Sequence, residues 1–326
     1  MNDLISVVIP IFNGRRYLED TLASLLAQTH QRWEALLVDD SSTDDSMAVL
    51  EDFARRDNRF RVFRKDNQRF ACYGIRYGVE RASGDWFFYM SQDDRLSPDY
   101  FERGLAAAKA AAADIALGSM VYFHDNVEEP FGMPLKEGDV ISGPEAFELS
   151  LDWCIHGFCL VRMSLIRRLG ISVGLLNDDE YDTRRQFFSA NRVAVSGGTF
   201  YYHMGNPQSI TKKWDMAQLD YITVAHRLRQ FARNNDIEHE GQIDSLLRNM
   251  STGACLRSAK MVYEAYRSGN ATKRDISQVM DAIVRSRPEW RGRSKALALG
   301  AALRPLTGSR VALTSIIKLQ TLCRRG

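Results

Sequence analysis

Cysteine is scarce in this sequence of 326 residues: the five copies are scattered and none forms a C-x-x-C pair. An odd number of isolated cysteines argues against a disulfide framework and against a zinc-binding fold. The sequence also lacks a run of about 20 apolar residues, the length that a membrane-spanning helix requires. The N-terminal apolar run is short and no basic region precedes it, so we expect no signal peptide and a cytoplasmic location.

Two further absences narrow the range of functions. The formal net charge is only +2, which gives no indication of a nucleic-acid partner. No G-x-G-x-x-G motif follows the first apolar segment, residues 6–11, and this absence counts against a dinucleotide-dependent oxidoreductase. Hydrophobic residues nevertheless make up 45% of the chain, enough to bury a sizeable core.

The charge is unevenly distributed along the chain. Eight of the 43 Lys and Arg residues lie between Trp290 and the C-terminus, a stretch without Asp or Glu, so the remainder is mildly acidic. Leucine, isoleucine and valine are interspersed with these cations, and Pro305 and Gly308 are expected to divide the stretch into two short helices. A basic amphipathic segment of this kind either contacts the inner face of an anionic membrane or packs on its own domain.

Strand-like and helix-like segments alternate over the first part of the chain. Apolar runs typical of strands occur at 6–11, 35–38, 61–63, 85–90 and 115–119. Between the first two, Leu18, Leu22 and Leu25 recur at helical spacing. The alternation predicts an α/β fold with a Rossmann-like, mostly parallel sheet flanked by helices. From Trp214 the pattern favours long helices, so we predict a sheet domain at 1–213 and a helical region at 214–326.

Polar residues follow three of the predicted strands, and the carboxyl ends of parallel strands meet at one edge of a sheet. Phe12 follows the first strand, Asp39 and Asp40 follow the second, and Asp93 and Asp94 follow the fourth. Adjacent carboxylates are costly unless a cation lies close to them, and Mg²⁺ or Mn²⁺ shared with phosphate groups would suit this pair. The alternative is a solvated turn in which a nearby Ser or Asp caps the next helix.

The remaining candidates also have two interpretations each. The pair Asp39-Asp40 can accept a hydrogen bond from an imide N–H, as uracil presents, or it can form an Asx turn that caps the next helix. Phe12 can stack on a nucleobase or pack in the core. The acidic cluster at 178–180 can supply a general base for a sugar hydroxyl or simply begin a helix. His203 can touch a metal or a phosphate, or it can have a structural role.

Taken in order, these segments resemble family 2 glycosyltransferases with the GT-A fold, over roughly residues 4–211. The segments that carry the resemblance are SVVIPIFN, LAQTH, LLVDDSSTDDS, ASGDW, SQDD, NDDEY and SIT. The resemblance implies an inverting transferase that moves a sugar from a nucleotide diphosphate, typically a UDP-sugar, to a glycan or lipid-linked acceptor. It also implies a place in cell-surface polysaccharide synthesis.

The resemblance further assigns roles to individual residues. It implies that Pro10 and Phe12 line the nucleoside pocket and that Asp93 lies near the ribose and the donor sugar. It implies that Asp40 meets the base, with Asp39 as a close competitor.

For the chemical step, the resemblance implies that Asp94 holds Mn²⁺ or Mg²⁺ on the diphosphate and that Asp179 is the catalytic base. Inversion requires one displacement and therefore no covalent nucleophile. An alternative is a non-catalytic protein of the same fold that binds a sugar nucleotide, although the acids at positions 94 and 179 argue against it.

The sequence departs from the family pattern at several positions. Ser91 stands where the metal motif usually begins with Asp, and Asp178 stands where the acid pair usually has Glu. The usual arginine after the third strand is displaced, and Arg69 or Arg76 is expected to replace it. No Q-x-x-R-W motif of processive synthases is present, so we expect transfer of a single sugar.

Overall fold

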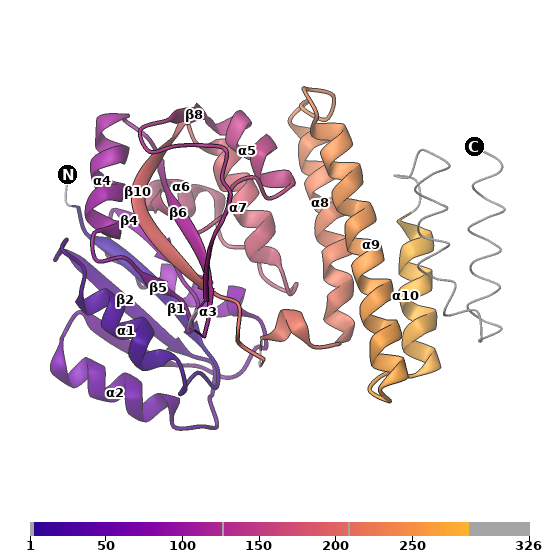
Figure 1. Cartoon of the computed structure of the whole chain (residues 1–326), viewed down its shortest axis with the longest axis horizontal. Helices are drawn as coiled ribbons and strands as arrows, with labels where there is room; N and C mark the ends of the chain where they lie inside the picture. Colours follow the sequence, from indigo (N-terminus) through magenta and orange to yellow (C-terminus); the bar gives the residue numbers. More distant parts are fainter. Residues whose placement is uncertain (1–2, 126, 208, 287–326) are drawn as a thin grey trace. The chain divides into compact units, whose positions relative to one another are not determined.

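The structure is a computed structural model that describes residues 3–125, 127–207 and 209–286, which form two compact units (Figure 1). The first unit extends to residue 174 and includes 178–206, and the second takes 175–177 and continues from Pro207. The second unit therefore begins shortly before the expected boundary at 213/214. The reason is local, because the carbonyls of Ile210 and Thr211 accept hydrogen bonds from Gln218 and Arg257 of the helical unit.

One mixed sheet forms the centre of the first unit. Its strands are β1 (Ile5–Ile11), β2 (Trp33–Asp39), β3 (Phe60–Arg64), β4 (Trp86–Tyr89), β5 (Arg95–Leu96), β6 (Ile115–His124), β7 (Val127–Pro130), β8 (Val140–Ser142), β9 (Cys159–Arg162) and β10 (Arg192–His203). They run in the order β3-β2-β1-β4-β9-β6-β10-β5, with β7 paired to β6 and β8 paired to β10.

The sheet contains both parallel and antiparallel strand pairs. The ladders that join β3, β2, β1 and β4 are parallel, and so is the ladder between β6 and β10. The short strand β9 is antiparallel to both of its neighbours, β4 and β6. The strands whose carboxyl ends precede the predicted acids, β2 and β4, thus belong to the parallel group β3-β2-β1-β4.

Helices cover both faces of the sheet. They are α1 (Leu18–Leu26), α2 (Ser46–Arg56), α3 (Ala71–Val79), α4 (Tyr100–Ala110), α5 (Gly143–Leu151), α6 (Met163–Leu169) and α7 (Asp178–Ser189). The cluster that contains Val7 and Ile9 takes side chains from α1, α2 and α4, whereas the cluster that contains Val8 takes side chains from α3, α5, α6 and α7. Two covered faces explain the continuous apolar sequence of β1 and β2. The predicted α/β sheet flanked by helices is confirmed.

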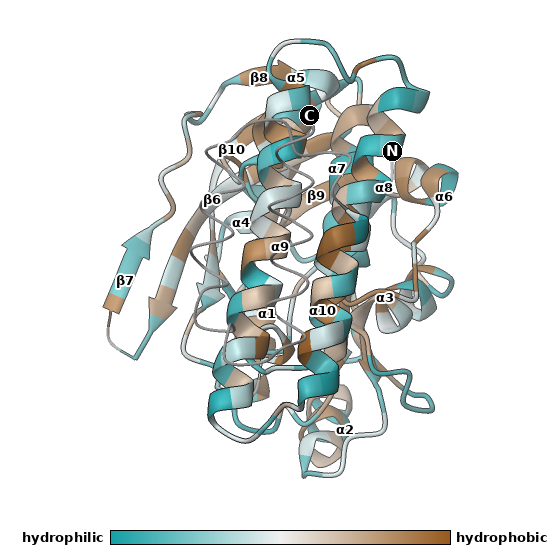
Figure 2. Ribbon diagram, turned by 90° about the vertical axis from the view of Figure 1, so that its right-hand side faces the viewer, coloured by the Kyte–Doolittle hydropathy of each residue, from teal (hydrophilic) through white to brown (hydrophobic). Residues whose placement is uncertain are grey.

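The second unit is helical, with α8 (Asp220–Asn234), α9 (Ile243–Arg267) and α10 (Lys273–Arg285). Its core joins Cys255 and Val262 of α9 to Val279 and Ile283 of α10. Figure 2 shows apolar and polar residues recurring along these two helices, as expected for amphipathic helices that bury one face. Thr272 and Asp275 form a capping box at the start of α10.

The C-terminal helices of this unit agree with the prediction of long helices after Trp214. Within the described ranges, no helix has the length and apolar character needed to cross a membrane. The predicted basic amphipathic tail falls at residues 287–326, which lie outside the described residues.

Candidate active site

Hydrogen bonds tie together the loops that follow β1, β2 and β4. The backbone N–H of Phe12 donates to Gln92 Oε1 at 2.9 Å, and Gln92 Nε2 donates to the carbonyl of Phe12 at 3.0 Å. The N–H of Asn13 donates to Ser42 Oγ at 2.9 Å. The loops that carry Phe12, Asp40 and Asp93 therefore lie together at the carboxyl edge of the parallel strands.

Phe12 and Pro10 lie at the start of this loop cluster. The Phe12 side chain is 47% exposed, so the interpretation that it packs in the core is wrong. Its ring is available to stack on a planar ligand. Pro10 is half-buried and lies against α3, where a Cβ at Gly74 would come within 2.8 Å of Pro10 Cβ. The close approach of α3 holds this end of β1 in place.

The adjacent acids Asp39 and Asp40 have different surroundings. Asp39 is fully buried, and its carboxylate accepts from the N–H of Ser42, three residues further along the chain, at 3.2 Å. Asp40 is at the margin of the loop cluster, where it pairs with Lys65 and accepts from the N–H of Gln68 at 3.1 Å. The burial of Asp39 leaves Asp40 as the better placed of the two to meet a ligand.

Asp94 is buried with an exposed fraction of 1%. Its Oδ1 accepts from the N–H of His203 at 3.0 Å, and its Oδ2 accepts from the N–H of Ser91 at 3.3 Å. Burial, followed by the neighbouring charge of Asp93, raises the pKa of Asp94 to about 8. The site therefore disfavours two carboxylate charges when nothing positive is bound.

The oxygen donors of this pair suit Mg²⁺ or Mn²⁺. Within the described part of the chain, no three His, Cys, Asp or Glu side chains gather into a metal site. Mg²⁺ in proteins is usually bound by one or two carboxylates and takes its other ligands from water and substrate phosphates. The repulsion between the buried Asp94 carboxylate and the half-buried carboxylate of Asp93 is the observation that makes a divalent cation fit these residues.

His203 and Asn206 lie beside the pair. His203 Nδ1 is 3.8 Å from Asp93 Oδ2, and the imidazole contacts the rings of Tyr17 and Phe123, each at a centroid distance of 4.9 Å. Asn206 Nδ2 donates to Asp93 Oδ2 at 2.6 Å. His203 thus combines a structural contact through its backbone with a position next to the acids. The sequence did not indicate Asn206, because no motif marks it.

The sequence pattern did not indicate Gln92 as a site residue either, although it is the second residue of the SQDD segment. Its two hydrogen bonds to Phe12 make it a positioning residue that joins the Phe12 loop to the acidic loop. The fit is close, since a Cβ at Gly14 would lie only 2.4 Å from Gln92 Oε1.

Replacing Gln92 with Ala is expected to raise KM for a substrate bound at these loops by about three- to tenfold, because two partly exposed hydrogen bonds are lost. The value of kcat should change less than KM, since the acids remain in place. Steady-state kinetics at varied concentration of this substrate measure both constants. Gln31→Ala is the matched control, because Gln31 precedes β2 and lies at the end of that strand opposite to Asp39. An equal rise in KM for Gln31→Ala would contradict the positioning role of Gln92.

Asp179 lies in the first turn of α7 and is partly exposed. Burial, followed by the charge of Glu180, raises its pKa to about 7. A carboxyl group with a pKa near neutrality is suited to take up a proton at physiological pH. Asp178, the other member of the acid pair, is fully buried.

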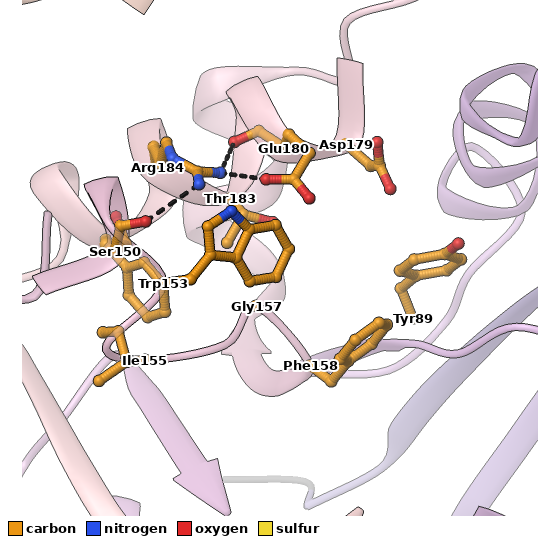
Figure 3. Close-up of a pocket in the computed structure, with 11 residues that line it drawn as sticks. Tyr89, Ser150, Trp153, Ile155, Gly157, Phe158, Asp179, Glu180, Thr183 and Arg184 are labelled. Atoms are coloured by element: carbon orange, nitrogen blue, oxygen red, sulfur yellow. Dashed lines mark hydrogen bonds and ion pairs between the residues drawn. The ribbon is translucent and has the colours of Figure 1, made fainter. Parts of the chain in front are cut away.

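Asp179 lines a pocket together with Tyr89, Trp153, Phe158 and Arg184 (Figure 3). Tyr89 is the last residue of β4, and its hydroxyl lies 3.4 Å from Ser91 Oγ in the acidic loop. Burial, then the charge of Asp179 and, more weakly, that of Asp94, raise the pKa of Tyr89 well above 10. Both acids therefore act on the same phenol, which remains protonated.

The fold and the acids at its carboxyl edge define a glycosyltransferase of the GT-A type. The family model of glycosyl transferase family 2 matches residues 6–170, about half of the chain, and the chain belongs to this family. The resemblance seen in the sequence is confirmed.

Relatives of known name support this membership. The chain is 34% identical over 258 residues to the putative glycosyltransferase EpsH of Bacillus subtilis, covering 74% of each chain. It is 27% identical over 224 residues to the glycosyltransferase GlyG of Streptococcus pneumoniae, covering 65% of this chain and 74% of GlyG. TuaG of Bacillus subtilis, a putative teichuronic acid biosynthesis glycosyltransferase, is 35% identical over 102 residues, which are 31% of this chain and 40% of TuaG.

Among solved structures, the crystal structure of S. aureus TarS 1–349 in complex with UDP-GlcNAc aligns with a TM-score of 0.67. The alignment covers 97% of this chain and 88% of TarS at 16% identity. Such a likeness shows a shared fold alone. The protein is thus a family 2 glycosyltransferase with relatives in polysaccharide biosynthesis.

Proposed function

We propose that this protein is an inverting, metal-dependent glycosyltransferase that moves one sugar from a UDP-sugar to a hydroxyl group of a glycan or lipid-linked acceptor. The observation that carries the proposal is the position of Tyr89 between two acidic centres. The phenol ends the strand that leads to Asp93 and Asp94, and it lines the same pocket as Asp179. A donor held at the acidic loop would thus face an acceptor held beside Asp179.

In this mechanism the protein binds, orients and removes a proton. Phe12 would stack on the base and Asp40 would accept its imide hydrogen, while Asp93 would lie near the ribose and the donor sugar. Mn²⁺ or Mg²⁺ on Asp94, when bound, would neutralise charge on the diphosphate leaving group. Asp179 would take the proton from the acceptor hydroxyl as its oxygen attacks the anomeric carbon. A single displacement inverts that carbon.

Two comparisons support the choice of substrates. TarS, which shares the fold, was crystallised in complex with UDP-GlcNAc, and this complex favours a uridine nucleotide as the donor here. TuaG bears a name that refers to teichuronic acid biosynthesis, which favours a role in cell-surface polysaccharide assembly.

Thermal melting of the whole protein tests the donor half of the proposal. UDP is expected to raise the melting temperature, and to raise it further with Mn²⁺ than with EDTA, because ligands that bind only the folded state stabilise it. Release of UDP from a panel of UDP-sugars then identifies the donor. If no nucleotide changes the melting temperature, the proposed donor site is wrong.

The pH dependence of transfer is expected to follow Asp179. Because this base must be deprotonated and its pKa is about 7, kcat should rise about tenfold per pH unit below 7 and become level above it. The same raised pKa means that the contribution of Asp179 to folding stability is lost as pH rises from about 4 to about 7. Initial rates at saturating substrates measure the profile, and a flat profile would contradict the role of Asp179.

A further inference from the structure

Trp153 has an unusual backbone conformation at the end of α5. Its φ is +64°, and its N–H donates to the carbonyl of Ser150 at 3.3 Å. The position after a helix end commonly adopts a left-handed conformation, but glycine is the usual residue there because a side chain adds steric cost. A bulky tryptophan at such a position is a local cost to the fold, which suggests a use for its side chain.

The indole of Trp153 is exposed to solvent and is also contacted by a buried arginine. Its exposed fraction is 46%, while the Arg184 guanidinium lies 5.4 Å from the ring centroid. Arg184 is itself 2% exposed, donates to the carbonyl of Ser150 at 3.0 Å and pairs with Glu180. Figure 3 shows the indole among the lining residues of the pocket, with Glu180 above it, Asp179 to its upper right and Tyr89 to its right. The buried arginine therefore orients a ring that solvent still reaches.

The composition of the pocket indicates the kind of ligand it accepts. Aromatic rings at Trp153, Phe158 and Tyr89 offer apolar surface, and the hydroxyl of Thr183 adds a polar group. The carboxylates of Asp179 and Glu180 face the pocket, whereas Arg184, the cation among its described lining residues, is paired with Glu180. An anionic group would be repelled, but the C–H face of a neutral sugar ring suits a π surface.

We propose that this pocket is the acceptor subsite and that Trp153 stacks on a neutral pyranose at the end of the acceptor, with a ring hydroxyl directed at Asp179. The inference rests on the proposed function and adds the chemical class of the acceptor. An open-chain polyol phosphate lacks the ring face and carries the wrong charge, so it should bind poorly here.

Saturation-transfer NMR on the full chain, with a panel of methyl pyranosides and with glycerol phosphate as probes, tests this subsite. The pyranosides should receive saturation and glycerol phosphate should not. Trp153→Ala should weaken pyranoside binding by about tenfold or more, and Trp153→Phe should restore most of it. Tyr266→Ala, at an exposed aromatic residue of α9, is the control and should bind like the wild type.

Trp153→Gly separates binding from folding. Glycine suits the left-handed conformation, so the melting temperature should not fall although pyranoside binding is lost. Unchanged pyranoside binding in Trp153→Ala and Trp153→Gly, or binding of glycerol phosphate instead of pyranosides, would overturn the inference. Binding of UDP, measured in parallel, reports on the donor site, so failure of the proposed function is seen separately as a wild type that does not bind UDP.

Discussion

Replacing Asp179 with Asn is expected to lower kcat by about 10²- to 10⁴-fold, the range that a positioned general base contributes. Asn has nearly the same shape as Asp but cannot accept the proton that leaves the acceptor hydroxyl. The affinity for UDP should stay close to that of the wild type, because Asp179 lies in the pocket of Trp153 and not in the loops that carry Phe12 and Asp40. Steady-state transfer assays and calorimetric UDP titration measure the two quantities.

Glu145→Gln is the matched control for this substitution. Glu145 is an exposed acid in the first turn of α5, so the change removes one negative charge from a helix N-terminus in the same unit. Its kcat should be within about twofold of the wild type, as for most surface changes. An Asp179→Asn protein that transfers sugar at the rate of the control would exclude Asp179 as the base. A wild type that binds UDP but transfers to no acceptor would favour the non-catalytic alternative.

Local patterns in the sequence carry the fold prediction. Strand β1 is recognised from SVVIPI because a strand covered on both faces is continuously apolar, and the motif order places the acids after the right strands. The antiparallel strand β9 is not predicted, although residues 154–161 form an apolar stretch. Its direction depends on where α5 delivers the chain, and no pattern within the strand encodes that path.

The site could be predicted only where the chemistry lies in adjacent residues. Asp93 and Asp94 are conspicuous as a pair. The preference for Asp40 over Asp39 depends on the family resemblance alone until the structure shows that Asp39 is buried. No motif in the sequence marks Trp153 as a site residue. Its role depends on a partner 31 positions away, Arg184, which holds the indole through a tertiary contact.

The second substitution with a large expected effect is at Asp94, and the reason is the burial of this carboxylate. Its carboxylate receives the N–H groups of His203 and Ser91, yet its pKa is raised because burial and the charge of Asp93 outweigh those hydrogen bonds. A divalent cation on this pair, as proposed, would supply the missing positive charge and would gain affinity from the same low-dielectric surroundings. Asp94 is thus the acid whose replacement should remove the response to metal.

Asp94→Asn is therefore expected to lower kcat at least about a hundredfold, since Lewis-acid stabilisation of a leaving group contributes several kcal/mol. It should also abolish the increase in melting temperature that Mn²⁺ produces with UDP, a readout that does not require turnover. Asp52→Asn, in an exposed ion pair on α2, should retain both properties. If Asp94→Asn keeps the full Mn²⁺ response in melting experiments, the cation binds elsewhere, and the acidic loop positions the donor through hydrogen bonds alone.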